Sequence, residues 1–381
     1  MTSSSKETRR DNFPGKRGPS VSPVSASYEK YEIYTEGDDL FEAMLAAIKN
    51  AKEQVWLATY IFSVDEIGRH FIASLTERAQ AGVDVRLVID ALGSFLLFPH
   101  RVEKELSSQG VKVHRYHRWH WREPLRYNRR DHRKLLVVDG AVAFLGGFNI
   151  HRESSLHVFG EKRWRDTHVK ITGELAKEAS DLFNSFWKGK MARCPSQIVK
   201  LQDELLPNHS RSCRQRLRCI YRDMFNSAVK YLYVTTPYFV PDRPIQKGLI
   251  AAARRGVDVR VLVPRKSDVR LVEWASRAAY TDLLVNGVRI FEYLPRMLHA
   301  KTMVMDDNFA TIGTSNIDYR SFFLNYELNL FSRNSDLSCR LHDLFISDLE
   351  DAEEIYQTSW KQRHWILRFL EWVGWMARRW L

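Results

Sequence analysis

Residues 131–150 read DHRKLLVVDGAVAFLGGFNI, and this stretch decides the fold and the chemistry expected of the chain. Within it, His132, Lys134 and Asp139 are spaced H-x-K-x-x-x-x-D. The apolar run after Lys134 predicts a short buried strand with the polar residues just before it. A histidine beside a lysine suits phosphate chemistry, because the imidazole attacks or donates a proton near neutral pH and the ammonium neutralises oxyanion charge.

The same spacing recurs in the second half of the chain, where residues 299–306 read HAKTMVMD. This copy contains His299, Lys301 and Asp306. A glycine and an asparagine follow each copy at equal offsets: Gly146 and Asn149 after the first, Gly313 and Asn316 after the second. Recurrence of five positions at fixed spacing indicates a functional motif rather than two solvated strand ends.

The sequence around the motifs is also duplicated. The phrase GVDVR occurs at residues 82–86 and again at 256–260, in each case after a helical pattern and at the start of a strand pattern. An order of helix, strand, helix, strand before each motif predicts an α/β fold layered around a sheet in each half. The expected helices are 39–52, 66–81 and 244–255, and residues 224–229 are expected to belong to another helix. The expected strands are 54–62, 83–90, 135–138, 231–236 and 257–263.

Composition divides the chain into five parts. Residues 1–27, rich in Ser, Pro, Lys and Arg, are expected to be a disordered basic tail. The two halves are expected at 28–190 and 215–360, joined by a polar linker at 191–214. Residues 361–381 form a separate aromatic and basic segment.

Charge and cysteine usage narrow the partners and the compartment. The net charge of +12 favours an anionic partner, either a nucleic acid, a phosphorylated metabolite or an acidic membrane. The 4 cysteines show no CxxC spacing, so a zinc or redox motif is not predicted and reduced thiols in the cytoplasm are expected. No apolar run reaches the roughly 20 residues that span a bilayer, and the N-terminus lacks the apolar core of a signal peptide.

Two segments interleave arginine with tryptophan and tyrosine. In residues 114–130, His114, His117 and His120 lie three apart, but few carboxylates and no cysteine accompany them, so no metal is predicted. An interfacial or phosphate-binding loop is favoured there, with a plain solvated loop as the alternative. Residues 365–380 suit a helix lying in a membrane interface, and a helix docked on the protein's own core is the alternative.

The paired motif resembles that of the phospholipase D superfamily. The flanks HRK (132–134), TPYFVP (236–241) and GTSN (313–316) resemble the bacterial cardiolipin synthases, in the short form without N-terminal transmembrane helices. The resemblance covers residues 31–360 and implies an α/β fold of two pseudo-symmetric halves. Each half would be a mixed sheet flanked by helices, with one active site at their interface.

The resemblance also implies roles for individual residues. The catalytic set would be His132, Lys134, Asp139, His299, Lys301 and Asp306. The phosphate-binding set would be Asn149, Asn316, Gly147 and Thr314, the last two standing where the superfamily often has serine. An acid downstream of each motif would orient its histidine, and Asp166 and Glu327 occupy these places. No metal or other cofactor is implied.

The implied reaction is transfer of a phosphatidyl group from one phosphatidylglycerol to another through a phosphohistidine, giving cardiolipin and glycerol. Phospholipase D-type hydrolysis and a nuclease or phosphodiesterase of the same superfamily are the alternatives, and a non-catalytic binder is disfavoured because both motifs are intact. The expected partners are phosphatidylglycerol and an anionic membrane surface, with no nucleic acid. The expected location is peripheral, on the cytoplasmic face of the inner membrane.

Overall fold

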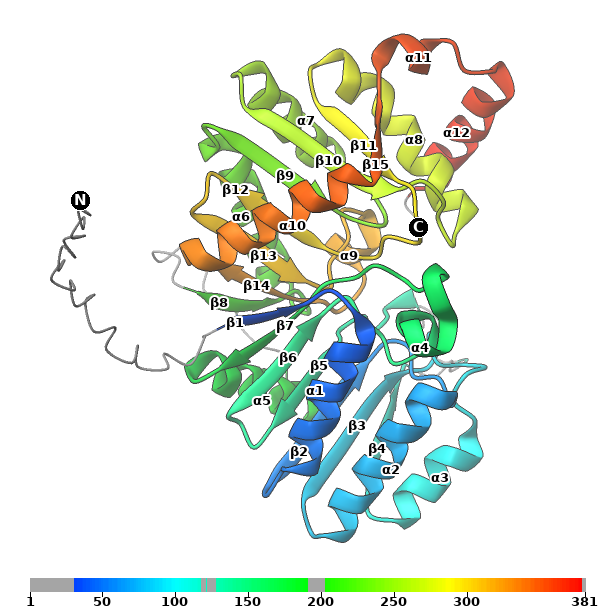
Figure 1. Cartoon of the computed structure of the whole chain (residues 1–381), viewed down its shortest axis with the longest axis vertical. Helices are drawn as coiled ribbons and strands as arrows, with labels where there is room; N and C mark the ends of the chain where they lie inside the picture. Colours follow the sequence, from blue (N-terminus) through cyan, green and yellow to red (C-terminus); the bar gives the residue numbers. More distant parts are fainter. Residues whose placement is uncertain (1–30, 118–120, 122–127, 191–202, 379–381) are drawn as a thin grey trace, which may run out of the picture. The chain divides into compact units, whose positions relative to one another are not determined.

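Short apolar runs such as residues 135–138 become the inner strands of two mixed sheets (Figure 1). The computed structural model describes residues 31–117, 121, 128–190 and 203–378. Leu136 and Val138 of strand β5 (Leu135–Val138) pack on one face of their sheet, and Leu135 and Val137 pack on the other. Burial on both faces explains why this run is apolar without alternation.

The first sheet has the order β1-β7-β6-β5-β2-β3-β4. Strands β2, β3 and β4 are parallel, and all the other pairings are antiparallel. The strands besides β5 are β1 (Tyr31–Tyr34), β2 (Gln54–Thr59), β3 (Asp84–Asp90), β4 (Lys112–Tyr116), β6 (Val142–Gly146) and β7 (His168–Thr172).

The second sheet repeats this arrangement with the order β15-β11-β10-β9-β12-β13-β14-β8. Its parallel strands are β9, β10 and β11, and β12 takes the place that β5 holds in the first sheet. The strands are β8 (Glu204–Pro207), β9 (Tyr231–Thr235), β10 (Asp258–Pro264), β11 (Arg289–Tyr293), β12 (Thr302–Met305), β13 (Phe309–Gly313), β14 (Leu328–Ser332) and β15 (Ala352–Ile355). The predicted α/β fold of two like halves is confirmed.

Helices cover both sheets, and the helices expected from periodicity are present within a few residues of their predicted ends. Residues 224–227 of the stretch 224–229 belong to the helix Arg211–Ser227. In the first half they are α1 (Gly37–Lys49), α2 (Glu66–Gln80), α3 (His100–Ser108), α4 (Leu156–Phe159) and α5 (Glu174–Trp187), with 3₁₀ turns η2 (Arg152–Ser154) and η3 (Gly160–Lys162). In the second they are α6 (Arg211–Ser227), α7 (Arg243–Arg254), α8 (Arg270–Val285), α9 (Tyr319–Phe323), α10 (Ser335–Glu350), α11 (Gln357–Lys361) and α12 (Trp365–Ala377).

The two halves share an apolar core. Leu145 and Val169 of the first sheet belong to the same buried cluster as Ile312 and Leu330 of the second. A shared core holds the two halves in one fixed relation, which a site built from both of them requires.

The expectations for the N-terminal tail, the linker and the cysteines can be compared with the structure. Residues 1–27 lie outside the described part of the chain, while β8 and the start of α6 fall within the range expected as linker, 191–214. The expectation that all cysteines are reduced is wrong for Cys213, which is disulfide-bonded, whereas Cys219 and Cys339 are free. Close spacing in sequence is not needed for a disulfide, because only the distance in space matters.

Candidate active site

Each histidine of the paired motif sits just before a central strand, on a loop that hydrogen-bonds to the opposite half. The backbone N–H of His132 donates to the carbonyl of Tyr326 at 2.9 Å, and the N–H of Tyr326 donates to the carbonyl of Arg130 at 2.8 Å. Likewise, the N–H of His299 donates to the carbonyl of Arg165 at 2.7 Å. The main chain therefore joins the two motif loops across the interface.

The acids that hold the histidines are exchanged between the halves. Nδ1 of His132 lies 2.9 Å and 3.1 Å from the two carboxylate oxygens of Glu327, and Nδ1 of His299 lies 2.5 Å from Oδ2 of Asp166. Because a carboxylate only accepts hydrogen bonds, Nδ1 is the protonated nitrogen and Nε2 carries the lone pair. The resemblance pointed to the two acids, but it assigned each to the histidine of its own half. The structure corrects that pairing.

Neither Gly147 nor Thr314 offers the phosphate-binding group that the resemblance implied. The hydroxyl of Thr314 donates to Oε2 of Glu327 at 2.6 Å, and the N–H of Gly147 donates to the carbonyl of Thr167 at 2.9 Å. A Cβ at position 147 would lie 1.9 Å from Oδ1 of Asp166, so only glycine fits there. Both groups thus have partners within the protein beside the acids, and a contact with phosphate stays a prediction.

Both motif lysines are buried behind the histidine loops. Nζ of Lys134 donates to the carbonyl of His132 at 2.8 Å, and Nζ of Lys301 donates to the carbonyl of His299. Burial, with a smaller effect of Lys301, lowers the pKa of Lys134 to about 7, and burial lowers the pKa of Lys301 to about 8. Two positive charges thus lie close together in a site that has little water to screen them.

Burial also keeps both histidines neutral. It lowers the pKa of His132, and burial together with Lys301 lowers the pKa of His299 to about 3. The pKa of Asp166 is lowered because Lys301 and His299 outweigh its own burial, so the acid stays ionised beside a neutral imidazole. A neutral imidazole with a free lone pair on Nε2 is suited to nucleophilic attack or to acting as a base.

Both histidines line one cavity of about 450 Å³ between the halves, together with Asn149 and Asn316. Oδ1 of Asn149 accepts from the N–H of Ile61 at 3.1 Å, which fixes the orientation of that amide. The remaining residues of the cavity are Tyr60, Ile61, Leu92, Asn128, Arg130, Trp164, Tyr238, Asp268, Val269, Val272, Asp318, Arg320 and Asn325.

The aromatic walls of this cavity were not among the predicted site residues. The ring of Tyr60 lies 4.9 Å from that of His132, and the ring of Trp164 lies 5.0 Å from that of His299. Tyr60 directly follows β2, and Tyr238 lies three residues after the equivalent strand β9. A tyrosine shortly after each copy of this strand was the signal available in the sequence, although the two tyrosines do not occupy the same position.

Asp139 and Asp306 do not line the catalytic cavity, so the geometry does not support the catalytic role that stays a prediction for them. Asp139 follows β5, whereas His132 precedes it, and the strand separates Lys134 from Asp139 by roughly 16 Å at ~3.3 Å per residue. The carboxylate of Asp139 accepts from the N–H groups of residues 52–54 at 2.8–2.9 Å. Asp306 does the same for residues 229–231. Each aspartate fastens the turn before the neighbouring strand.

The described residues contain no cluster of three or more histidines, cysteines or acids that would hold a metal ion. Nδ1 of His117 lies 2.6 Å from the carbonyl oxygen of Arg129, and His114 packs against Trp187. His120 lies outside the described residues. Among the groups that can be placed, positive charge at the site comes from Arg130 and Arg320 in the lining and from the two lysines behind the histidine loops.

Two like halves that each contribute a histidine to a single pocket, with a buried lysine behind each histidine, define a protein of the phospholipase D class. The family model described as "Cardiolipin synthase, PLD-like domain" matches residues 44–187 and 221–349. The chain belongs to this cardiolipin synthase family.

Relatives support the assignment along most of the chain. It is 34% identical over 360 residues to a cardiolipin synthase of Clostridium perfringens, covering 89% of this chain and 74% of the relative. It is 31% identical over 368 residues to one of Staphylococcus aureus, covering 90% of this chain and 72% of the relative. Among solved structures, a phosphatidylserine synthase of Haemophilus influenzae has the same fold, with a TM-score of 0.70, 16% identity, and coverage of 93% of this chain and 96% of that one.

Proposed function

We propose that the chain is a cardiolipin synthase that transfers a phosphatidyl group from one phosphatidylglycerol to another. The observation that carries the proposal is the pair of neutral, acid-held histidines, His132 and His299, in one cavity backed by two buried lysines. Two histidines suit a two-step transfer, in which one takes the phosphatidyl group and the other moves the proton.

In the first step, Nε2 of His132 attacks the phosphorus of the donor phosphatidylglycerol. The bond from phosphorus to the oxygen of the headgroup glycerol breaks. His299 gives a proton to the departing glycerol oxygen. The negative phosphodiester stabilises the imidazolium form of His299, which opposes the lowering of its pKa by burial and by Lys301. The products of this step are glycerol and a phosphohistidine at position 132. The choice of His132 as the nucleophile and His299 as the acid follows the resemblance to the family.

In the second step, the hydroxyl of a second phosphatidylglycerol loses its proton to His299 and attacks the phosphorus. The N–P bond breaks, and its electron pair returns to Nε2 of His132. We assign Lys134, Lys301, Asn149 and Asn316 to the non-bridging oxygens, whose charge grows as phosphorus becomes five-coordinate. Lysine charge thus supplies the stabilisation, and the proposed steps use no cofactor.

We infer that the reaction takes place at a membrane surface, because the substrate has two acyl chains and the pocket has an apolar rim. Leu92 and Val269 line the cavity while remaining exposed, and Phe95 and Leu96 lie on the loop that Leu92 begins. Among the described residues, no helix is long and apolar enough to cross a bilayer. We place the protein peripherally on the cytoplasmic face of the inner membrane, whose anionic lipids attract a chain of net charge +12.

Product analysis after incubation with phosphatidylglycerol in mixed micelles and excess chelator tests the proposal. The expected products are cardiolipin and glycerol, absent for His132→Ala and His299→Ala variants that retain their circular dichroism. A phosphohistidine trapped in His299→Ala but not in His132→Ala would support the order of steps. Phosphatidic acid as the main product would show a hydrolase instead. Wild-type cardiolipin output from either alanine variant would refute the two-histidine mechanism.

A further inference from the structure

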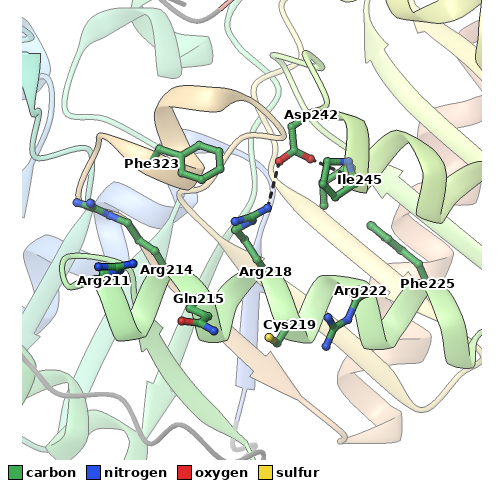
Figure 2. Close-up of a pocket in the computed structure, with 11 residues that line it drawn as sticks. Arg211, Arg214, Gln215, Arg218, Cys219, Arg222, Phe225, Asp242, Ile245 and Phe323 are labelled. Atoms are coloured by element: carbon green, nitrogen blue, oxygen red, sulfur yellow. Dashed lines mark hydrogen bonds and ion pairs between the residues drawn. The ribbon is translucent and has the colours of Figure 1, made fainter.

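Helix α6 carries a stripe of arginines that the catalytic site does not use. Arg211, Arg214, Arg218 and Arg222 are spaced three, four and four residues apart, so they share one face of the helix (Figure 2). Like charges at this spacing repel one another and weaken a helix. Such a stripe is better explained by an anionic ligand than by helix stability.

The stripe lines a cavity of about 580 Å³, which is larger than the catalytic one of about 450 Å³. We call it the arginine cavity. Ile245 and Phe323 form an apolar wall opposite the arginines, and Phe225 of α6 lies beside Arg222 at the end of the stripe (Figure 2). Its lining residues are Arg211, Arg214, Gln215, Arg218, Cys219, Arg222, Phe225, Asp242, Pro244, Ile245 and Phe323.

The arginines of the arginine cavity outnumber the acids beside them. Among the described residues, Asp242 is the one acid in the lining, and its carboxylate lies 3.9 Å from Nη2 of Arg218 while it also caps α7 through the N–H of Ile245 at 3.0 Å. Nε of Arg222 lies 3.5 Å from Oδ1 of Asp223. Nη2 of Arg214 is buried with no hydrogen-bond acceptor among the described residues. Burial lowers the pKa of Arg214, as expected for a cation without a counter-charge.

The arginine cavity is separate from the catalytic pocket but adjoins the same short helix. The two cavities share no lining residue among those described. Asp318, the N-cap of α9, and Arg320 within it line the catalytic pocket, and Phe323 at its end lines the arginine cavity. The guanidinium of Arg218 lies 5.1 Å from the centre of the Phe323 ring.

We propose that the arginine cavity is a second binding site for a phosphate-bearing anion, distinct from the catalytic site. Guanidinium groups bind phosphate oxygens through paired, charge-assisted hydrogen bonds. The apolar wall beside the arginines matches an amphipathic ligand, so the headgroup of an anionic phospholipid fits this site better than free phosphate does. Binding at this site requires no turnover. The proposal of a second site can therefore be tested independently of the proposed reaction.

Cys219 provides a reporter, because it is a free thiol in the lining of the arginine cavity. Its alkylation rate is measured by mass spectrometry of the peptide, with exposed Cys339 on α10 as an internal control. The probes are phosphatidylglycerol vesicles, neutral phosphatidylcholine vesicles, and inorganic phosphate at matched ionic strength. His132→Ala is used throughout, so that turnover does not consume the lipid.

Phosphatidylglycerol vesicles are expected to slow alkylation of Cys219 several-fold without changing Cys339. Arg214→Gln/Arg218→Gln is expected to raise the half-protecting lipid concentration roughly 30-fold, at ~1 kcal/mol for each arginine and 1.4 kcal/mol for each factor of ten. The matched control is Lys49→Gln/Arg69→Gln, which removes the same charge from exposed positions on α1 and α2 and is expected to change little.

The probes distinguish the source of the anion. Protection by phosphatidylglycerol alone identifies a lipid headgroup, and equal protection by inorganic phosphate identifies a free phosphate ligand. The proposal is overturned if neither phosphatidylglycerol nor inorganic phosphate protects Cys219 in the His132→Ala protein with all arginines intact. This outcome does not depend on whether the arginine variant folds. Equal loss of protection in the control variant would also overturn it, because general charge would then explain the binding.

Discussion

Replacing Glu327 by glutamine tests the exchange of acids between the halves. The Glu327 carboxylate is fully buried and accepts from His132 in the other half, from Thr314 at 2.6 Å and from Ser321 at 2.9 Å. Glutamine has the same shape but replaces one oxygen by an NH₂ group. When that group faces Nδ1, His132 must accept there, and its proton moves to Nε2.

A proton on Nε2 removes the lone pair that attacks phosphorus. Acids that orient a catalytic or metal-bound imidazole contribute ~10²- to 10⁴-fold, which is about 3–5 kcal/mol of transition-state stabilisation. The loss of stability is smaller, at ~1–3 kcal/mol, because the hydroxyls of Thr314 and Ser321 can rotate to accept from the new amide. We therefore expect kcat to fall 10²- to 10⁴-fold in a protein that still folds.

The assay combines steady-state cardiolipin synthesis, thermal unfolding and ¹⁵N chemical shifts of the histidine rings. Glu292→Gln is the matched control: Glu292 is a buried acid of the second half, 2.7 Å from Arg265 and 3.3 Å from Arg277, outside the catalytic cavity. It should lose stability while keeping kcat. The reasoning is refuted if Glu327→Gln keeps wild-type kcat, or if the ring of His299 changes its tautomer and that of His132 does not.

Three further predictions follow from the site and its surroundings. Asp139→Ala should lower the free energy of unfolding by ~1–2 kcal/mol, as loss of a helix cap does, with kcat unchanged; a large loss of kcat at full stability would restore a catalytic role. Because the pKa values of Lys134 and Lys301 are about 7 and about 8, both lose their protons as pH rises through this range, so kcat/KM should fall above pH 7; Lys134→Arg should move that decline to higher pH, and an unmoved decline would exclude Lys134 as its origin. Trp365→Ala/Trp372→Ala removes exposed rings from α12 and should weaken sedimentation with phosphatidylglycerol vesicles about tenfold or more, whereas unchanged binding would exclude this face from membrane contact.

The position of α12 confirms one of the two alternatives drawn from the sequence, a helix docked on the protein, and leaves the other, membrane contact, as a prediction. The helix docks on α8 through Gly374, where a Cβ would lie 2.5 Å from the backbone nitrogen of Ala275. Its other face exposes Trp365, Phe369 and Trp372. Aromatic residues in a helical stretch do not tell which face is buried, because a glycine that permits close approach looks the same as any other glycine in the sequence.

The fold and the histidine–lysine pairs were predictable because they repeat. His132 with Lys134, and His299 with Lys301, are local patterns, and each lies before a strand whose apolar run marks it as buried. Asp139 is part of the same spaced pattern, yet it lies at the other end of β5. Spacing along a strand sets a distance of ~3.3 Å per residue, and this simple count would have separated the aspartate from the histidine.

The exchange of acids was beyond the reach of a single sequence, because it is a contact over 195 positions between His132 and Glu327 and over 133 between His299 and Asp166. It also predicts that neither half would be active alone. A separated half would leave its own histidine without an acid and its own acid without the histidine donor, although Glu327 would keep Thr314 and Ser321, and Asp166 would keep the N–H of Thr167. The exchange therefore makes catalysis depend on the correct packing of the two halves. If the interface is misaligned, His132 and His299 both lose the acid that keeps their proton on Nδ1.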